Sequence, residues 1–425
     1  MRVLATTMTV ASMAACLLPA GAGPAPTRPQ PKPTAFNSVK EMTRTIQKLR
    51  KVRRKDAGGY LEAYLYQLRM RAFPNDSVDW KRWDAAVAHR SKMPAARIGV
   101  SRGGVRAMGL GERWQFMGPH NLATPYRLFY GEGKLSGRVN AVAYDAGHPG
   151  TCYLTASGGG VWKSTDSGAN WTPLSDTWPY IKAGSIALDP SNTNTVFVGT
   201  GDFDGSSAYC MGIMKSTDGG ATWTNYGRSD FGDAAVSALA VDPDSPSIVL
   251  AATGRGRVGL GYVWRSTDAG VTWSPVLTNS AAWSDLKIGA PPVSGGRAIY
   301  ATGLYNGGQM WRSTDQGATW TKLNPPLTPG TTYDQNSLEC ATSPTAAGVV
   351  YLVSGYDQKV WKSADYGADG TWTDITGNFP NGTDNYNWSQ RWYDIHAHCT
   401  TRTVAGNPVD VLYVGLITLA QSLSG

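Results

Sequence analysis

From about residue 139 onward, apolar and polar residues alternate in short runs. Residues 139–145, 185–190 and 236–243 follow this pattern, and each run ends in turn-forming residues. A period of two over four to eight residues predicts a half-buried β-strand. We therefore expect this part of the chain to be built from short antiparallel strands.

Two further strand patterns follow each alternating run. The second pattern covers residues 196–199, 248–252, 299–302 and 349–353, and the third covers residues 160–163, 261–265 and 309–312. After the third comes one phrase in five versions, STDSGANW, STDGGATW, STDAGVTW, STDQGATW and the stretched SADYGADGTW. Its closing Trp begins a fourth, outer strand, so each unit has four strands.

The phrase recurs at an almost constant spacing. Its first residues are Ser164, Ser216, Ser266, Ser313 and Ser363, which lie 52, 50, 47 and 50 residues apart. A repeat of 40–50 residues with four strands is typical of a β-propeller. We predict an all-β fold, a β-propeller of about six four-stranded blades with a small helical N-terminal extension.

The sixth blade is expected to be incomplete. Residues 392–399 and 411–415 resemble its first two strands, and residues 421–425 stand where the phrase begins in earlier blades. Either residues 114–118 supply the missing fourth strand and close the ring, or the ring is open.

Within the phrase, each residue type has a structural purpose. The aspartate at its third position can accept hydrogen bonds from the turn, and the glycine at its fifth supplies a positive φ. The tryptophan buries a large ring against the blade. We therefore expect structural rather than catalytic roles for Asp166, Asp218, Asp268, Asp315 and Asp365.

The N-terminal quarter of the chain has a different organisation. Residues 1–22 resemble a secretory signal peptide, residues 23–36 form a Pro-rich linker, and residues 37–113 show helical periodicity before the propeller at 114–425. Apart from the signal, no apolar run reaches the 18 or so residues of a membrane span. We expect a secreted, periplasmic or cell-surface protein.

Positive charge is concentrated in the same quarter of the chain. Residues 1–113 hold 21 Lys and Arg against 7 Asp and Glu, while the remainder carries a net charge of −6. The densest run is KLRKVRRK at 48–55, but no nucleic-acid-binding motif accompanies it. We interpret the run as a solvated helix face and expect no nucleic-acid partner.

Four cysteines remain after the signal: Cys152, Cys210, Cys340 and Cys399. No CxxC pair occurs, which disfavours a zinc cage. An exported protein could form one or two disulfides from them, and the sequence leaves all three pairings open.

The repeated phrase resembles the Asp-box, or BNR, repeat. This repeat occurs in sialidases, sortilin-type receptors, xyloglucan-specific endoglucanases and uncharacterised secreted bacterial propellers. The resemblance covers about residues 113–425 and is greatest to the uncharacterised group, on residues 136–168 and 187–202. It implies the fold and leaves the activity open. In the endoglucanases an aspartate of the second-to-third turn of the first blade acts as the catalytic base, and this chain has Ser157 at that position. Glu132, Glu339 and Arg138 do not reproduce the sialidase arrangement.

Candidate binding residues fall on the face opposite the phrase. Aromatic rings stack on sugar faces while polar groups fix orientation, so this face suits a glycan or an extended peptide. The alternative is that aromatics such as Phe231 and Trp283 only cover the blade ends. The candidates are Trp178, Tyr180, Arg255, Tyr305, Tyr356, Trp388 and Trp392.

Carboxylates on this face raise two further hypotheses. Glycoside hydrolysis needs two of them about 5–10 Å apart, and Asp202 and Asp204 are the first suspects, with Asp357 and Asp394 as others. Asp202 and Asp204 could also bind calcium. Asp394, His396 and His398 alternate along one strand, so their side chains share one side and could bind a divalent metal. No other cofactor is expected.

The sequence thus favours a secreted binding module, not an enzyme, whose ligand is a glycan or an exported protein. The alternative is a sialidase-like or endoglucanase-like glycoside hydrolase that uses carboxylates on the same face.

Overall fold

The computed structural model describes most of residues 138–425 and isolated residues between 39 and 89. Within 138–425 it leaves out residues 204–209, 233, 255–260, 305–307, 329–337, 380–394, 416–418 and 423–425. Most of the isolated residues lie in helix. The predicted signal, linker and closing strand at 114–118 lie outside the described residues, so these boundaries remain predictions.

Every sheet in the described part of the chain is antiparallel, and its strands follow one another in chain order. Blade 1 consists of β1 (Val139–Tyr144), β2 (Cys152–Ala156), β3 (Gly160–Ser164) and β4 (Thr172–Pro173). Blade 2 consists of β5 (Ala183–Leu188), β6 (Val196–Thr200), β7 (Ile213–Ser216) and β8 (Thr224–Tyr226). The short helix α5 (Arg228–Phe231) follows β8.

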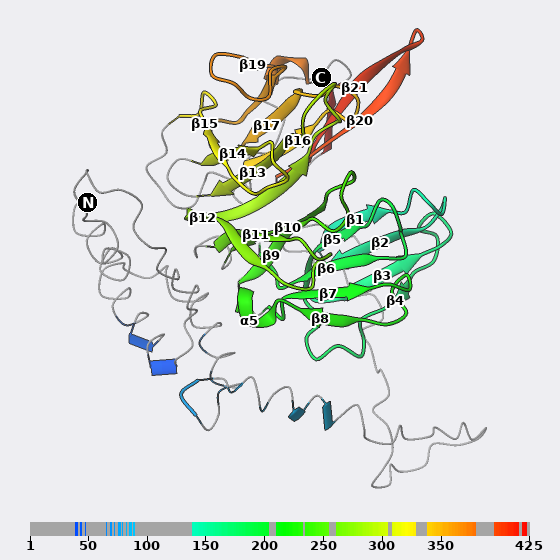
Figure 1. Ribbon diagram of the computed structural model, residues 1–425, viewed down its shortest axis with the longest axis vertical. Coiled ribbons are helices and arrows are strands. Elements are labelled where there is room, and N and C mark those ends of the chain that lie inside the picture. The colour runs from blue at the N-terminus through cyan, green and yellow to red at the C-terminus, as the bar shows by residue number, and fades with distance from the viewer. Residues whose placement is uncertain are drawn as a thin grey trace, which may run out of the picture.

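Blades 3 and 4 form a single seven-stranded sheet because they share one long strand. β12 (Ser274–Ile288) is the outer strand of blade 3 in its first half and the inner strand of blade 4 in its second (Figure 1). The remaining strands of these blades are β9 (Ala235–Val241), β10 (Val249–Gly254), β11 (Gly261–Ser266), β13 (Ile299–Leu304), β14 (Gln309–Ser313) and β15 (Thr321–Leu323).

Two blades complete the described part of the fold. Blade 5 contains β16 (Leu338–Thr342), β17 (Val350–Ser354), β18 (Lys359–Ser363) and β19 (Trp372–Asp374), followed by the 3-10 turn η4 (Thr376–Asn378). Blade 6 shows three strands, β20 (His396–Val404), β21 (Asn407–Gly415) and β22 (Leu419–Ser422). The prediction of a nearly all-β fold with about six blades is confirmed.

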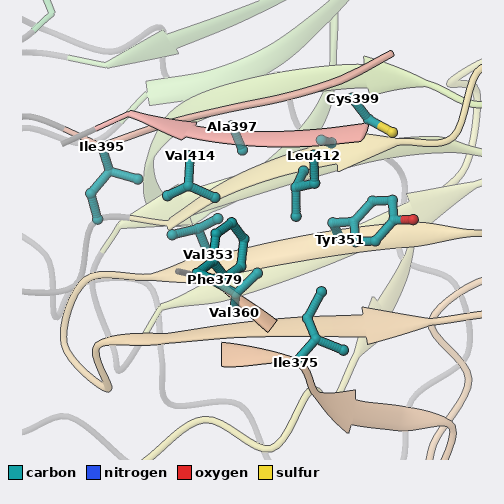
Figure 2. Packing of buried hydrophobic residues seen from close by; sticks show 11 residues of the cluster. Tyr351, Val353, Val360, Ile375, Phe379, Ile395, Ala397, Cys399, Leu412 and Val414 are labelled. Carbon is teal, nitrogen blue, oxygen red and sulfur yellow. The ribbon is translucent and has the colours of Figure 1, made fainter. Parts of the chain in front are cut away.

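The hydrophobic core is divided into layers, one between each pair of successive blades. Between blades 5 and 6, Tyr351 and Val353 of β17 face Ala397 of β20 and Leu412 and Val414 of β21 (Figure 2). Equivalent layers lie between each earlier pair of blades. Each blade is therefore stabilised by its neighbours, as in other repeat folds.

Blade 1 differs from the others on the face that points away from blade 2. Val142 pairs with Leu154 and is 57% exposed, and Tyr144 is 70% exposed. The equivalent of Val142 in blade 4 is Leu286, which packs on blade 3 and is 4% exposed. No described residue covers Val142 in the way that blade 3 covers Leu286.

Candidate functional site

The antiparallel order of each blade sorts its turns onto two faces. The turns from the first to the second strand and from the third to the fourth lie at one end of the blade. The turn from the second to the third strand lies at the other end, beside the start of the first strand. The repeated phrase therefore occupies one face, called here the turn face, and the candidate binding residues belong to the opposite face.

On the turn face, hydrogen bonds within each phrase fix its conformation. In blade 2, Asp218 accepts bonds from the Thr222 amide (2.8 Å), the Thr222 hydroxyl (2.6 Å) and the Ser216 hydroxyl (2.7 Å). The same set forms around Asp268 and Asp315, and around Asp166 with Asn170 in place of threonine. These four carboxylates are engaged by their own turns.

Asp365 departs from this pattern. The two extra residues of its phrase displace the threonine, so the Ser363 hydroxyl contacts Thr371 Oγ1 at 2.7 Å instead of the aspartate. The amides of Asp365 (3.2 Å) and Gly367 (3.0 Å) still donate to the Ser363 hydroxyl, as in the other turns. The hydrogen bonds of this turn therefore centre on Ser363, and the structural role of Asp365 stays a prediction.

On the opposite face, a polar cluster joins blades 1 and 2. Arg138, immediately before β1, forms an ion pair with Asp202, which follows β6 and is 3% exposed. The second oxygen of Asp202 accepts a 2.6 Å bond from the hydroxyl of Ser157, in the turn between β2 and β3. The Arg138 guanidinium also donates to Ser157 Oγ (3.3 Å) and, through Nε, to Asn140 Oδ1 (3.0 Å).

This cluster holds the arginine in one orientation and leaves part of it accessible. Asn140 is itself held by a 2.8 Å bond to the Ala183 carbonyl at the start of blade 2. The Arg138 side chain is 34% exposed, and its Nη1 has no partner among the described residues. Two N–H donors remain for a ligand, while both Asp202 oxygens are occupied.

Several predicted aromatic candidates pack within the protein. Trp178 is 6% exposed and makes an edge-to-face contact with Trp223, with ring centroids 5.2 Å apart. Phe231 and Trp283 are fully buried. Tyr180 is half-buried against the same cluster as Trp178, and Tyr356 is half-buried in the turn after β17. The buried rings of Trp178, Phe231 and Trp283 cover the blade ends. Arg255, Tyr305, Trp388 and Trp392 lie outside the described residues.

The predicted carboxylate and metal sites are only partly described. Asp202 belongs to the cluster with Arg138, and Asp357 accepts bonds from Ser354 Oγ (2.7 Å) and the Thr328 amide (3.1 Å). Asp204 and Asp394 lie outside the described residues. His396 and His398 share one exposed side of β20, and the described residues contain no group of three metal-ligating side chains.

An ion pair between a buried aspartate and a half-buried lysine on β12 was not predicted. Lys287 Nζ lies 2.6 Å from Asp285 Oδ1 on β12, and Asp285 also accepts a 3.3 Å bond from the Cys340 amide of blade 5. Burial alone would raise the pKa of Asp285, but Lys287 holds it below its usual value. The sequence signal for this pair is the alternation Asp285-Leu286-Lys287, which places the two charged residues on the same face of the strand.

Together, the blade order and the two-faced arrangement define a β-propeller protein. A family model described as the DUF6242 beta propeller domain matches residues 138–365. The chain belongs to this family. Among the described residues, no helix has both the length and the apolar character needed to cross a membrane.

Over part of its length, the chain is similar to xyloglucanases. Over 136 residues the chain is 36% identical to xyloglucanase Xgh74A of Acetivibrio thermocellus, which is 29% of this chain and 16% of that enzyme. Over 160 residues it is 29% identical to a xyloglucanase of Hypocrea jecorina, covering 34% and 18% of the two chains. The chain thus spans less than a fifth of either relative.

Among solved structures, the chain is similar to the GH74 xyloglucanase of Xanthomonas campestris. The TM-score is 0.50 at 16% identity, over 67% of this chain and 45% of that one. At this identity the likeness concerns the fold.

Proposed function

We propose that the chain is an exported β-propeller that binds a glycan on the face opposite the repeated turns. The observation that carries this proposal is the cluster of Arg138, Ser157 and Asp202, which presents oriented donors on that face. Oriented donors of this kind suit sugar hydroxyls. The similarity to xyloglucanases supports a glycan over an exported protein as the ligand.

We also propose that the repeated turns are Asp-boxes, because four of their aspartates make the same bonds around a serine and a threonine or asparagine. The export proposal rests on the signal-like residues 1–22. Tyr180, Arg255, Tyr305, Tyr356, Trp388 and Trp392 are proposed as further ligand contacts, while the packing of Trp178 makes it a support for this face.

Isothermal titration calorimetry of the full chain with xyloglucan oligosaccharides tests the proposed glycan binding. We expect binding that Arg138→Met weakens at least tenfold, a change of about 1.4 kcal/mol. Arg402→Met is the matched control, because Arg402 is exposed at the far end of β20, on the turn face. Absence of binding to any glycan would refute the proposal.

A reducing-sugar assay on the same samples addresses the alternative, a glycoside hydrolase. Asp202 has both oxygens engaged by Arg138 and Ser157, so it is poorly placed to exchange a proton with a substrate. We expect no release of sugar. Sugar release that Asp202→Asn abolishes would favour the hydrolase.

A further inference from the structure

For one glycine beside the polar cluster, the described residues give no structural reason why it should be glycine. Gly158 lies in the exposed turn between β2 and β3, next to Ser157. A Cβ atom added to it would meet nothing within 4 Å, and its φ is not left-handed. Glycine in an ordered turn costs conformational entropy on folding, so a larger residue would be tolerated or favoured by the fold.

The neighbouring glycines show the contrast. Gly160 has a φ of +75°, and a Cβ there would collide with Ser175. At Gly159 an added Cβ would lie 3.3 Å from the Cβ of Ala156, which is a tight contact. The fold therefore accounts for Gly160 and partly for Gly159, but not for Gly158.

A bare backbone is useful where a ligand must approach closely. The turn is held in place on both sides of Gly158: the Trp162 indole donates to the Gly159 carbonyl at 2.7 Å, and Ser157 donates to Asp202. The Arg138 Nη1 donors belong to the same cluster. Among the described residues, the space above Gly158 is open and adjoins a rigid edge whose Arg138 Nη1 donors have no partner.

The charge of this edge restricts the ligand. The positive charge of Arg138 is offset by the buried carboxylate of Asp202, with which it forms an ion pair. The Arg138–Asp202 pair has no net charge, so the guanidinium offers hydrogen bonds without attracting an acidic sugar.

From these observations we infer that Gly158 is a ligand-contact position, where a neutral sugar ring packs against the backbone beside Arg138. This inference rests on the proposed function and adds the position and the charge class of the ligand.

The test is a graded series, Gly158→Ala, Gly158→Val and Gly158→Leu, in the full chain. Gly377→Val is the matched control, because Gly377 is also exposed, has no left-handed φ and would place its Cβ in open space. Binding of xyloglucan oligosaccharides, which are neutral, is compared with binding of oligogalacturonides, which are acidic. Thermal unfolding of every variant is measured alongside.

We expect the affinity for the neutral oligosaccharides to fall stepwise, by at least about tenfold for Gly158→Leu. Gly377→Val should bind like the native chain, and all unfolding midpoints should stay within about 3 °C of the native value.

Native affinity in the Gly158 series would overturn the inference and leave the proposed function standing. Tighter binding of the acidic oligosaccharides would overturn the neutral assignment. A native chain that binds neither would refute the proposed function and the inference with it. If Gly158→Val unfolds early, Gly158→Ala decides between a structural role and a binding role.

Discussion

Lys163 Nζ donates a 3.0 Å hydrogen bond to the Gly219 carbonyl, so the third strand of blade 1 is tied to the repeated turn of blade 2. The Tyr153 hydroxyl donates to the same oxygen at 3.2 Å. Three later blade pairs repeat the contact at the same positions, in Lys215 to Ala269 (2.8 Å), Arg265 to Gln316 (2.8 Å) and Arg312 to Tyr366 (2.9 Å). The repeated turn therefore also joins its blade to the preceding one.

Replacing this cation should weaken the boundary between blades 1 and 2. Lys163→Met keeps much of the apolar stem but removes the charged donor, while Tyr153 still satisfies the carbonyl. We expect the free energy of unfolding in urea to fall by about 1 kcal/mol. Lys322→Met, at an exposed position of β15, should change it by less than about 0.5 kcal/mol; equal effects of the two variants would contradict a role for the contact.

The repeated turns should make stability depend on pH in the acid range. Hydrogen bonds from Asn170 and Thr222 lower the pKa of Asp166 and Asp218 from 3.8 to about 2. Because the pKa values are lower in the folded state, the stabilisation is present above about pH 4 and is lost as pH falls toward 2. Thermal unfolding midpoints measured between pH 6 and 2 should show this decline.

Asp218→Asn should remove part of that dependence. Asp176→Asn serves as the control, because Asp176 is exposed and makes no hydrogen bond to a described residue. A pH profile in Asp218→Asn identical to that of the native chain would show that the turn carboxylates do not link folding to protons.

Blades 5 and 6 are joined through one carboxylate. Asp410 on β21 accepts bonds from the Tyr351 hydroxyl and from the Ser343 hydroxyl, both at 2.8 Å. Asp410→Ala leaves two hydroxyls near the interface without their acceptor, so we expect a loss of about 1–3 kcal/mol in urea unfolding. Tyr351→Phe removes one bond and should cost less; the reverse order would mean that packing, not hydrogen bonding, dominates there.

Two of the cysteines should be unreactive in the folded protein. None of the four described cysteines is in a disulfide. Burial raises the pKa of the Cys340 thiol well above 9 and that of Cys399 to about 12, so little thiolate forms at pH 8. Mass spectrometry after alkylation should find both unmodified in the native protein and modified in urea. Val293→Cys, at a fully exposed position, is the positive control, and rapid native labelling of Cys340 would contradict the packing of β16.

The features that could be predicted from the sequence are local ones. The phrase, its spacing and the alternating strands are set by residues close in the chain, and the blades follow from them. Arg138 and Asp202 are 64 residues apart and belong to different blades, so no local pattern announces their ion pair. Trp178 precedes its strand much as a binding aromatic would, and only its contact with Trp223 distinguishes the two roles.

Continuity of β12 could also have been anticipated. The link between blades 3 and 4, TNSAAW at 278–283, contains neither Gly nor Pro, whereas turn-forming residues separate most other neighbouring strands. Asn279 and Ser280 favour a turn only weakly, and without Gly or Pro to interrupt it a strand can continue from one blade into the next.

That continuous strand has a mechanical consequence. In most repeat folds each unit can fray separately, because only side-chain contacts and a flexible loop join it to the next. Here a backbone ladder belongs to both units, so detaching either blade would break hydrogen bonds along β12 itself. Blades 3 and 4 should therefore lose their amide protection against hydrogen exchange together, as one cooperative unit.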